Sequence, residues 1–420
     1  MSFQQGLSGL NASAKNLEVI GNNVANANTY GAKSSRAEFA DMYANALSGG
    51  GANNIGIGVT LAAVAQQFTQ GNISSTDNPM DLAINGAGFF QLADSNGGVE
   101  YSRNGQFRVD RDGYVVNVQM QRLMGFPADA TGAIQAGQAK ALQMPTAGIT
   151  PAETSRVKME LNLDARAQVT APTSGPPIDF LDPTTFNNAT SLTVYDAKGQ
   201  DVALTYYFQK AATDQWNVYV TANGTPIATA GGNPAPSTTL TFPANGGKPT
   251  SPLGPVALSI PAVTNSVGAL TVAIPNVDLV VSGATQYGSQ FGVTDLSQDG
   301  YAPGQLIGVQ FEANGIITAR YSNGQSKPAG QVEIATFRNA QGLQAVGGNA
   351  WTRTYASGDP IVGVPGEGSL GVLQAGALEE SNVDLTAELV NMITAQRVYQ
   401  ANAQTIKTQD QVLQTIVNLR

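Results

Sequence analysis

The carboxylates are the residues of this chain whose chemistry could support catalysis, because the sequence contains no His and no Cys. This absence excludes a Cys nucleophile, a His general base and zinc sites built from those ligands. Two carboxylates alone can hydrolyse a glycosidic bond, and Glu379 and Glu380 are adjacent. Adjacent side chains on a helix do not face each other, so this pair is interpreted as charge near a helix N-terminus. The sequence predicts no catalytic residue and no enzyme activity.

Glycine-rich stretches are the next chemical signal, because such loops can hold phosphates. GGGANNIGIG (49–58) and INGAGF (84–89) lack the full spacing and the strand and helix flanks of a nucleotide-binding loop. DRDG (110–113) and DSNG (94–97) contain carboxylates but lack the spaced ligands and the terminal Glu of a calcium loop. These stretches are interpreted as turns, and neither a cofactor nor a metal ion is predicted.

Charge and hydropathy exclude further classes of protein. The chain of 420 residues has a formal net charge of −9, and only 12% of its residues are charged, against a usual share of about 25%. Nucleic acids and anionic membranes attract basic patches, so neither is a predicted partner. No apolar run approaches the roughly 20 residues of a transmembrane helix. The start, MSFQQGLSGL, has neither the basic nor the apolar segment of a cleavable signal peptide.

Both ends of the chain carry an apolar heptad pattern that predicts a helix. Gly31 could cap the first helix, and Ser381, Asn382 and Asp384 are plausible N-caps of the second. An isolated amphipathic helix is marginal in water, so each stripe needs a partner. The two ends could pair within one chain, or they could pair and also contact neighbouring copies, as their uncharged Asn and Gln faces favour. The predicted interface residues are Leu7, Leu10, Ala14, Leu17, Val24, Leu385, Leu389, Met392, Tyr399, Ala403, Ile406, Leu413 and Val417.

Between the ends, the sequence indicates β structure. Asp-Gly at 112–113 and Asn-Gly at 314–315 and 323–324 lie between apolar runs and predict two-residue hairpins. Of the 21 prolines, 14 fall within 146–285, which predicts a separate, turn-rich β domain. Inside it, residues 192–226 predict an antiparallel meander with Tyr and Trp in the core. The expected fold class is mixed α and β and multidomain, with a terminal α-helical coiled-coil domain and nested all-β domains.

Long, specific motifs lie at both ends of the chain and in its core. They are LSGLNASAKNLEVIGNNVANANTYGAK (7–33), GNISSTDNPMDLAINGAGFFQL (71–92), YSRNGQFRVDRDGYVVN (101–117), SGDPIVGVPGEGSLGVLQAGALEESNVDL (357–385) and SNVDLTAELVNMITAQRVYQANAQTIKTQDQVLQTIVNLR (381–420). Together they resemble the signatures of the bacterial flagellar axial proteins, the family of rod, hook and hook-associated proteins. Hook members are the most similar, because rod members lack the large central insert.

The resemblance implies a layered subunit with four parts. The expected layers are an inner helical coiled-coil domain (1–30 with 380–420), a linker between layers (31–75 with 366–379), a middle β domain (76–145 with 286–365) and an outer, inserted β domain (146–285). The inner layer would line a central channel. The nesting agrees with the helical periodicity at the ends and the prolines in the insert.

The resemblance also implies a function. A member of this family would be a structural subunit of the flagellar hook, polymerising into a helical tube that acts as a flexible universal joint and transmits torque to the filament. The implied partners are other copies, the rod protein at the proximal end, a hook-associated junction protein at the distal end, the hook cap and the flagellar export apparatus. The implied location is the extracellular hook, reached by type III export without signal cleavage. The alternatives are a distal-rod subunit of the basal body and, more remotely, a secreted β-rich adhesin or glycosidase.

Overall fold

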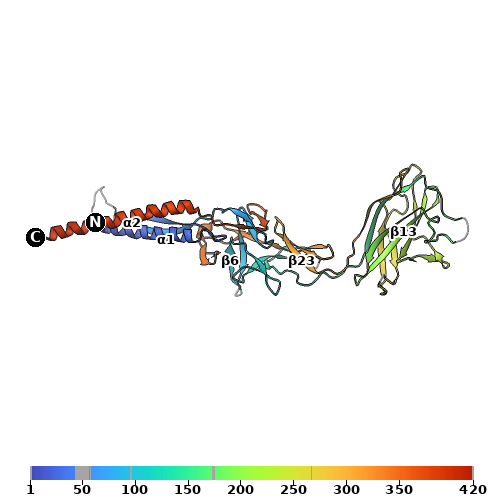
Figure 1. The fold of residues 1–420 in the computed structure, drawn as a ribbon, viewed down its shortest axis with the longest axis horizontal. Helices are drawn as coiled ribbons and strands as arrows, with labels where there is room; N and C mark the ends of the chain where they lie inside the picture. The colour runs from blue at the N-terminus through green and yellow to red at the C-terminus, as the bar shows by residue number, and fades with distance from the viewer. Residues whose placement is uncertain are drawn as a thin grey trace. The chain divides into compact units, whose positions relative to one another are not determined.

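The computed structural model describes residues 2–42, 56, 58–94, 97–129, 131–172, 176–265 and 267–418 of the chain. The glycine-rich stretch 49–58, apart from Gly56 and Gly58, and the centre of DSNG at 95–96 therefore lie outside the described residues. The chain divides into two units, which Figure 1 shows. The first unit comprises Met1–Thr146, Gly308–Arg320 and Ser326–Arg420, and the second comprises Ala147–Ile307 and Tyr321–Gln325.

The N-terminal heptad pattern forms helix α1, Ser2–Ala25. The helix ends before Gly31, so this glycine does not supply its C-cap. Gly31 has a left-handed φ of 72°, and a Cβ at this position would lie 2.5 Å from the backbone nitrogen of Asn104. Glycine is therefore required here by the close approach of another segment, as well as by the backbone conformation.

The C-terminal pattern forms helix α2, Leu385–Asn418, whose 34 residues span about 51 Å. Of the three predicted N-caps, Asp384 takes that role, because its Oδ1 accepts hydrogen bonds from the backbone nitrogens of Thr386 (2.9 Å) and Ala387 (3.1 Å). The side chain of Asn382 instead bonds to other segments of the chain. The predicted helix and one of its predicted caps are thus confirmed.

A β-hairpin of β1 (Ser35–Met42) and β2 (Gly58–Gln66) packs along α1. Asn23 exchanges two hydrogen bonds of 2.8 Å with the backbone of the first residue of β1. Near the other end of the helix, Ser8 Oγ accepts a hydrogen bond from the backbone nitrogen of Val59 (3.2 Å). The hairpin is therefore attached to both ends of α1.

The remainder of the first unit is β structure drawn from both sides of the insert. Its main sheet runs in the order β23-β24-β25-β9-β5-β6-β28-β27, with β7, β8, β10, β26 and β29 beside this path, and two further pairs are β3-β31 and β4-β30. The bounds are β3 (Ile73–Ser75), β4 (Leu82–Asn85), β5 (Phe89–Ala93), β6 (Val99–Ser102), β7 (Arg108–Val109), β8 (Val115–Val116), β9 (Arg122–Pro127), β10 (Lys140–Ala141), β23 (Leu306–Phe311), β24 (Ile316–Tyr321), β25 (Ser326–Val332), β26 (Ile334–Thr336), β27 (Gln344–Gly347), β28 (Ala350–Thr352), β29 (Ile361–Gly363), β30 (Val372–Ala375) and β31 (Ala377–Glu379), with a short 3-10 helix at Ala340–Gly342.

All three predicted hairpins form between neighbouring strands, but the predicted two-residue loops are wrong, because each loop has three residues. Each loop is closed by a backbone N–H of Asp110, Glu312 or Tyr321 that donates to the backbone oxygen four residues later. The Asp-Gly turn lies between β7 and β8, and the Asn-Gly turns lie between β23 and β24 and between β24 and β25. Gly113, Gly315 and Gly324 have φ values of 87°, 84° and 81°, in the left-handed region that favours glycine. The turn chemistry read from the sequence therefore sets these local pairings.

The second unit contains two five-stranded sheets around one apolar core. The predicted meander is confirmed, since β12, β13, β14 and β15 pair antiparallel in chain order. Trp216 and Tyr206 are fully buried in the core, as predicted. In the other sheet β11 pairs in parallel with β20 and β21, and the strands after residue 285 complete this sheet. The bounds are β11 (Arg156–Asp164), β12 (Asn188–Tyr195), β13 (Asp201–Ala212), β14 (Gln215–Ala222), β15 (Thr225–Pro226), β16 (Thr229–Ala230), β17 (Asn233–Pro234), β18 (Thr238–Thr241), β19 (Val256–Ile260), β20 (Ile274–Val280), β21 (Thr285–Tyr287) and β22 (Gly292–Gln298).

One buried carboxyl in the first unit leads to a prediction. Glu333 lies between β25 and β26, and burial raises the pKa of its side chain because the ionised form loses hydration. We expect Glu333→Gln to raise the free energy of unfolding near neutral pH. Below the pKa of an unfolded Glu, the side chain is neutral in both states and burial costs no stability. As the pH rises from there through the higher folded pKa, burial of the ionised carboxylate lowers the free energy of unfolding.

Urea unfolding across a pH series tests this prediction. The advantage of Glu333→Gln over the unsubstituted chain should shrink as the pH falls toward the value of an unfolded Glu, about 4.3. An advantage that stays constant across the series would show that ionisation of Glu333 does not destabilise the folded unit.

Candidate assembly interface

α1 and α2 run antiparallel and pack along a seam of small and polar residues. A Cβ added at Gly9 would lie 2.9 Å from Nδ2 of Asn402, so the two helices approach closely at this point. At the other end of the seam, Asn23 Nδ2 donates a hydrogen bond to Glu388 Oε1 (3.1 Å). Small residues and polar contacts, rather than large apolar side chains, therefore hold this part of the pair.

Most of the predicted interface residues keep part of their surface accessible. Leu7 and Leu389 are each 45% exposed, and Leu413 is 55% exposed. Ile406 does contact α1, because a Cβ added at Gly6 would lie 3.1 Å from its Cγ1. Leu385 and Tyr399 are also exposed. The half-buried members of the set are Leu10, Ala14, Leu17, Val24, Met392, Ala403 and Ile406. The side chain of Val417 lies outside the described residues. An apolar surface thus remains on the helix pair after its two helices have packed.

The sequence pattern did not predict which residues of α1 pack against α2. The buried positions of α1 include Gly6, Ser13 and Ile20, which share the heptad spacing of the predicted stripe but lie one residue earlier. Glycine and serine carry no hydropathy signal, so a search for apolar residues passes over them. The signal that could have found the first half of the seam is the pair of small residues Gly6 and Ser13 at heptad spacing, which the large apolar Ile20 then continues.

A buried group of three charges joins segments that are far apart in the sequence. Glu379 Oε1 accepts a hydrogen bond from Lys33 Nζ (2.6 Å), and its Oε2 accepts one from Arg103 Nη1 (3.0 Å). The three side chains are at most 5% exposed. Lys33 follows α1, Arg103 follows β6 and Glu379 ends β31, so this charge triad connects the helical ends of the chain to the β structure.

The charge triad is completed by backbone groups. Lys33 Nζ donates to the backbone oxygen of Thr69 (2.8 Å), and Arg103 Nη2 donates to that of Gly86 (2.8 Å). Desolvation lowers the pKa of Lys33 and of Arg103, and the neighbouring Glu379 carboxylate opposes this effect. The two cations therefore depend on one carboxylate for their charge compensation.

The interpretation of Glu379 and Glu380 as a pair near a helix N-terminus is wrong for Glu379. Glu379 ends strand β31 and points into the charge triad, whereas α2 begins only at Leu385. Glu380 is exposed. Adjacent residues of an extended segment face opposite sides, which separates the two carboxylates into different environments.

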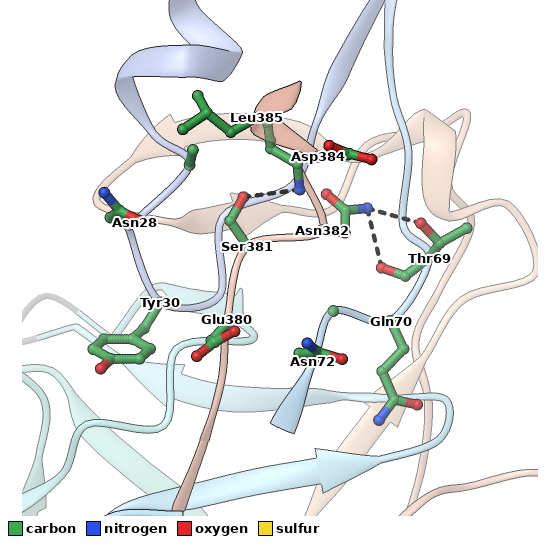
Figure 2. A pocket seen from close by; sticks show the side chains of 13 residues that line it. Asn28, Tyr30, Thr69, Gln70, Asn72, Glu380, Ser381, Asn382, Asp384 and Leu385 are labelled. Carbon is green, nitrogen blue, oxygen red and sulfur yellow. Dashed lines mark hydrogen bonds between the residues drawn. The ribbon is translucent and has the colours of Figure 1, made fainter. Parts of the chain in front are cut away.

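A pocket of about 580 Å³ lies between the end of α1, residues 69–72 and residues 380–385 (Figure 2). Asn382 forms one wall, because its Oδ1 accepts a hydrogen bond from the backbone nitrogen of Ser34 (2.7 Å) and its Nδ2 donates to Thr69 Oγ1 (2.8 Å). Tyr30, Glu380 and Leu385 are among the other lining residues. Within the described ranges, no group of three or more acidic residues is placed to hold a metal ion, and no helix is long and apolar enough to cross a membrane.

Comparison with known proteins places the chain in a family. It is 42% identical to the flagellar hook protein FlgE of Salmonella typhimurium, and the alignment covers 100% of both chains. It is 40% identical to FlgE of Escherichia coli, again over 100% of both chains. The chain belongs to the flagellar hook protein family. A more distant hook-family relative, FlgE of Rhizobium meliloti, is 32% identical over 100% of this chain and 98% of its own.

Family descriptions and one solved structure match separate parts of this hook-family chain. The descriptions are the flagella basal body rod protein (residues 3–33), the flagellar hook protein FlgE/F/G D1 domain (83–171), the flagellar basal body protein FlaE D2 domain (162–301) and the flagellar basal body rod FlgEFG protein C-terminal (374–419). The crystal structure of Helicobacter pylori flagellar hook protein FlgE2 has a similar fold, with a TM-score of 0.52 at 16% identity over 73% of this chain and 99% of that chain. The predicted family and the mixed, multidomain fold class are confirmed.

Proposed function

We propose that this chain, as a structural subunit of the bacterial flagellar hook, polymerises with its own copies into a helical tube through α1 and α2. The observation that carries this proposal is the apolar surface that the helix pair leaves exposed, at Leu7, Leu389 and Leu413. Burying a leucine side chain contributes roughly 1.5–3 kcal/mol, so neighbouring copies gain stability by covering these residues. A face that meets a different face on the next copy, without closing into a ring, generates a helical tube.

The proposal keeps the expected layers. Residues 1–30 with 380–420 form the inner layer, and 31–75 with 366–379 link the layers. The expected boundary at 285 moves to 307, because β22 pairs with β11 of the insert, so 76–146 with 308–365 form the middle β layer and 147–307 the outer one. It is supported by the helix pair built from the two chain ends and by the separate core of the insert. The predicted interface residues of both helices belong to the inner layer.

The tube serves as a universal joint that transmits torque while bending. In this proposal the inner helices hold the tube together, and the β domains of neighbouring copies slide over one another through polar contacts. The low share of charged residues, 12%, supports sliding because few fixed ion pairs can form between such faces. Further proposed partners are the rod protein, a hook-associated junction protein, the hook cap and the export apparatus, which passes the chain to the extracellular hook without signal cleavage.

The alternatives are less well supported. Hook proteins align with this chain over its full length, insert included, which favours a hook subunit over a distal-rod subunit. Electron microscopy of the polymer separates the two, because a hook subunit should form short curved tubes and a rod subunit straight ones. A non-enzymatic role is supported by the separation of Glu379 and Glu380, the one carboxylate pair that the sequence presents.

A chain shortened to residues 31–380 tests the proposed role of the helices. This fragment keeps Lys33, Arg103 and Glu379, so the charge triad that joins its segments is retained. We expect its circular dichroism to keep the β signal, its assembly into tubes to be lost and cells that carry only this form to be non-motile. Assembly of the shortened chain would show that the terminal helices are not the interface.

A further inference from the structure

The pocket in Figure 2 combines an apolar wall with a carboxylate that the described residues leave unsatisfied. Leu385 is 44% exposed at one end of the pocket, and Tyr30 is half-buried at the other end, near Glu380. Asp384 uses its Oδ1 to cap α2, whereas the Glu380 carboxylate has neither an ion pair nor a hydrogen bond with any described residue. Such a pocket suits a side chain with a long aliphatic stem and a cationic end, because the stem can cover apolar surface while the charge meets the carboxylate.

α2 presents a matching side chain on its open face. Val390, Ile393 and Arg397 are spaced by three and four residues and therefore lie on one side of the helix. Val390 is 59% exposed and Ile393 is 52% exposed. Arg397 is exposed and has no ion-pair or hydrogen-bond partner among the described residues. This face thus offers two apolar side chains and one free guanidinium.

Arg397 cannot reach the pocket of its own chain. Arg397 lies on the same helix as Leu385, about 18 Å further along its axis at 1.5 Å per residue, which is beyond the reach of its side chain. We infer that Arg397 of a second copy of this chain enters the pocket and places its guanidinium on Glu380, on the side of the pocket where Tyr30 lies. This inference rests on the proposed self-assembly and identifies one contact within it. It requires neighbouring copies that meet through this pocket to be shifted by about 18 Å along α2.

Lys407 is the other exposed, unpaired cation of α2, and it provides a matched control. One turn away on its face lie Gln404 and Gln411, which are polar. Its surroundings therefore lack the apolar side chains that would accompany Arg397 into contact with a partner. A lysine also presents a point charge, whereas arginine can hold a carboxylate with two parallel hydrogen bonds.

Charge exchange in the full-length chain tests the contact. Purified Glu380→Arg and Arg397→Glu variants should each raise the critical concentration for tube assembly about tenfold at low salt, because each variant places like charges together. The double variant Glu380→Arg/Arg397→Glu should return to within about threefold of the unsubstituted chain, and added salt should reduce all these differences. Lys407→Glu should change the critical concentration less than about twofold. Circular dichroism of the unassembled variants should be unchanged, because both positions are exposed.

The outcomes separate this contact from self-assembly itself. Rescue in the double variant, without rescue in Glu380→Arg/Lys407→Glu, supports the contact. Single variants that assemble normally, or a double variant at least as impaired as the singles, overturn it while leaving the proposed function intact. Failure of the unsubstituted chain to form tubes would overturn the proposed function and this inference together.

Discussion

The Glu379→Ala variant should lose about 3–5 kcal/mol of unfolding free energy in its first unit, because Lys33 and Arg103 would remain buried without a counter-charge. Urea unfolding followed by fluorescence measures this loss. Trp351 is buried in the first unit and Trp216 in the second, so a Trp216→Phe background restricts the signal to the first unit. The transition reported by Trp351 should move to lower urea concentration.

Two further variants identify the cause of this loss. Glu380→Ala changes the adjacent residue, which is exposed and outside the charge triad, so it should alter stability by less than about 0.5 kcal/mol. Glu379→Gln keeps the shape of the side chain but not its charge, and it should be nearly as damaging as Glu379→Ala. If Glu379→Gln were close to neutral, packing rather than charge compensation would explain the role of this residue.

The Leu389→Asp variant should fail to assemble, with its critical concentration raised at least about 100-fold. Leu389 is 45% exposed in the single chain, so a carboxylate there is tolerated before assembly. In the proposed tube the same position is covered by a neighbouring copy, and an unpaired carboxylate buried there loses its hydration. The contribution of the leucine side chain, roughly 1.5–3 kcal/mol, is lost as well. Light scattering and electron microscopy of the full-length variant measure the effect, and Leu413→Asp should behave in the same way.

Gln396→Asp is the matched control for this prediction. It adds the same charge at an exposed position of the same helix but removes no apolar side chain. Because Gln396 lies one heptad after Leu389 on the same side of α2, its new carboxylate would also lose hydration, so the critical concentration should rise, but less than for Leu389→Asp. Equal impairment of Gln396→Asp and Leu389→Asp would point to added negative charge on α2 as the cause, rather than to loss of an apolar contact. Unchanged circular dichroism of both variants would exclude misfolding.

Local patterns in the sequence predicted local structure well. The heptad stripes became α1 and α2, and Asp384 became an N-cap, because helical periodicity and capping depend on residues within a few positions of each other. The glycines of the three predicted hairpin turns adopt left-handed conformations for the same reason. The meander of the second unit follows from short connections between consecutive strands.

Contacts between distant segments were not predictable in the same way. Nothing near Lys33 or Arg103 in the sequence indicates that both side chains meet Glu379, since the ion pairs join residues 346 and 276 positions apart. The parallel pairing of β11 with β20 and β21 also depends on the path of the whole insert. The seam of α1 was missed by one residue, because its partner α2 selects small side chains that hydropathy does not mark.

The sequence by itself determined that this chain has helical ends, a β-rich middle, a separate proline-rich insert and no Cys or His chemistry. These properties follow from periodicity, turn residues and composition, which act over short distances along the chain. Only the tertiary structure decided which side chains of the helices face each other and which stay exposed, and which carboxylate is buried in the charge triad. Those outcomes depend on the close approach of segments hundreds of residues apart, where burial changes the energy of a charge and glycine permits contact.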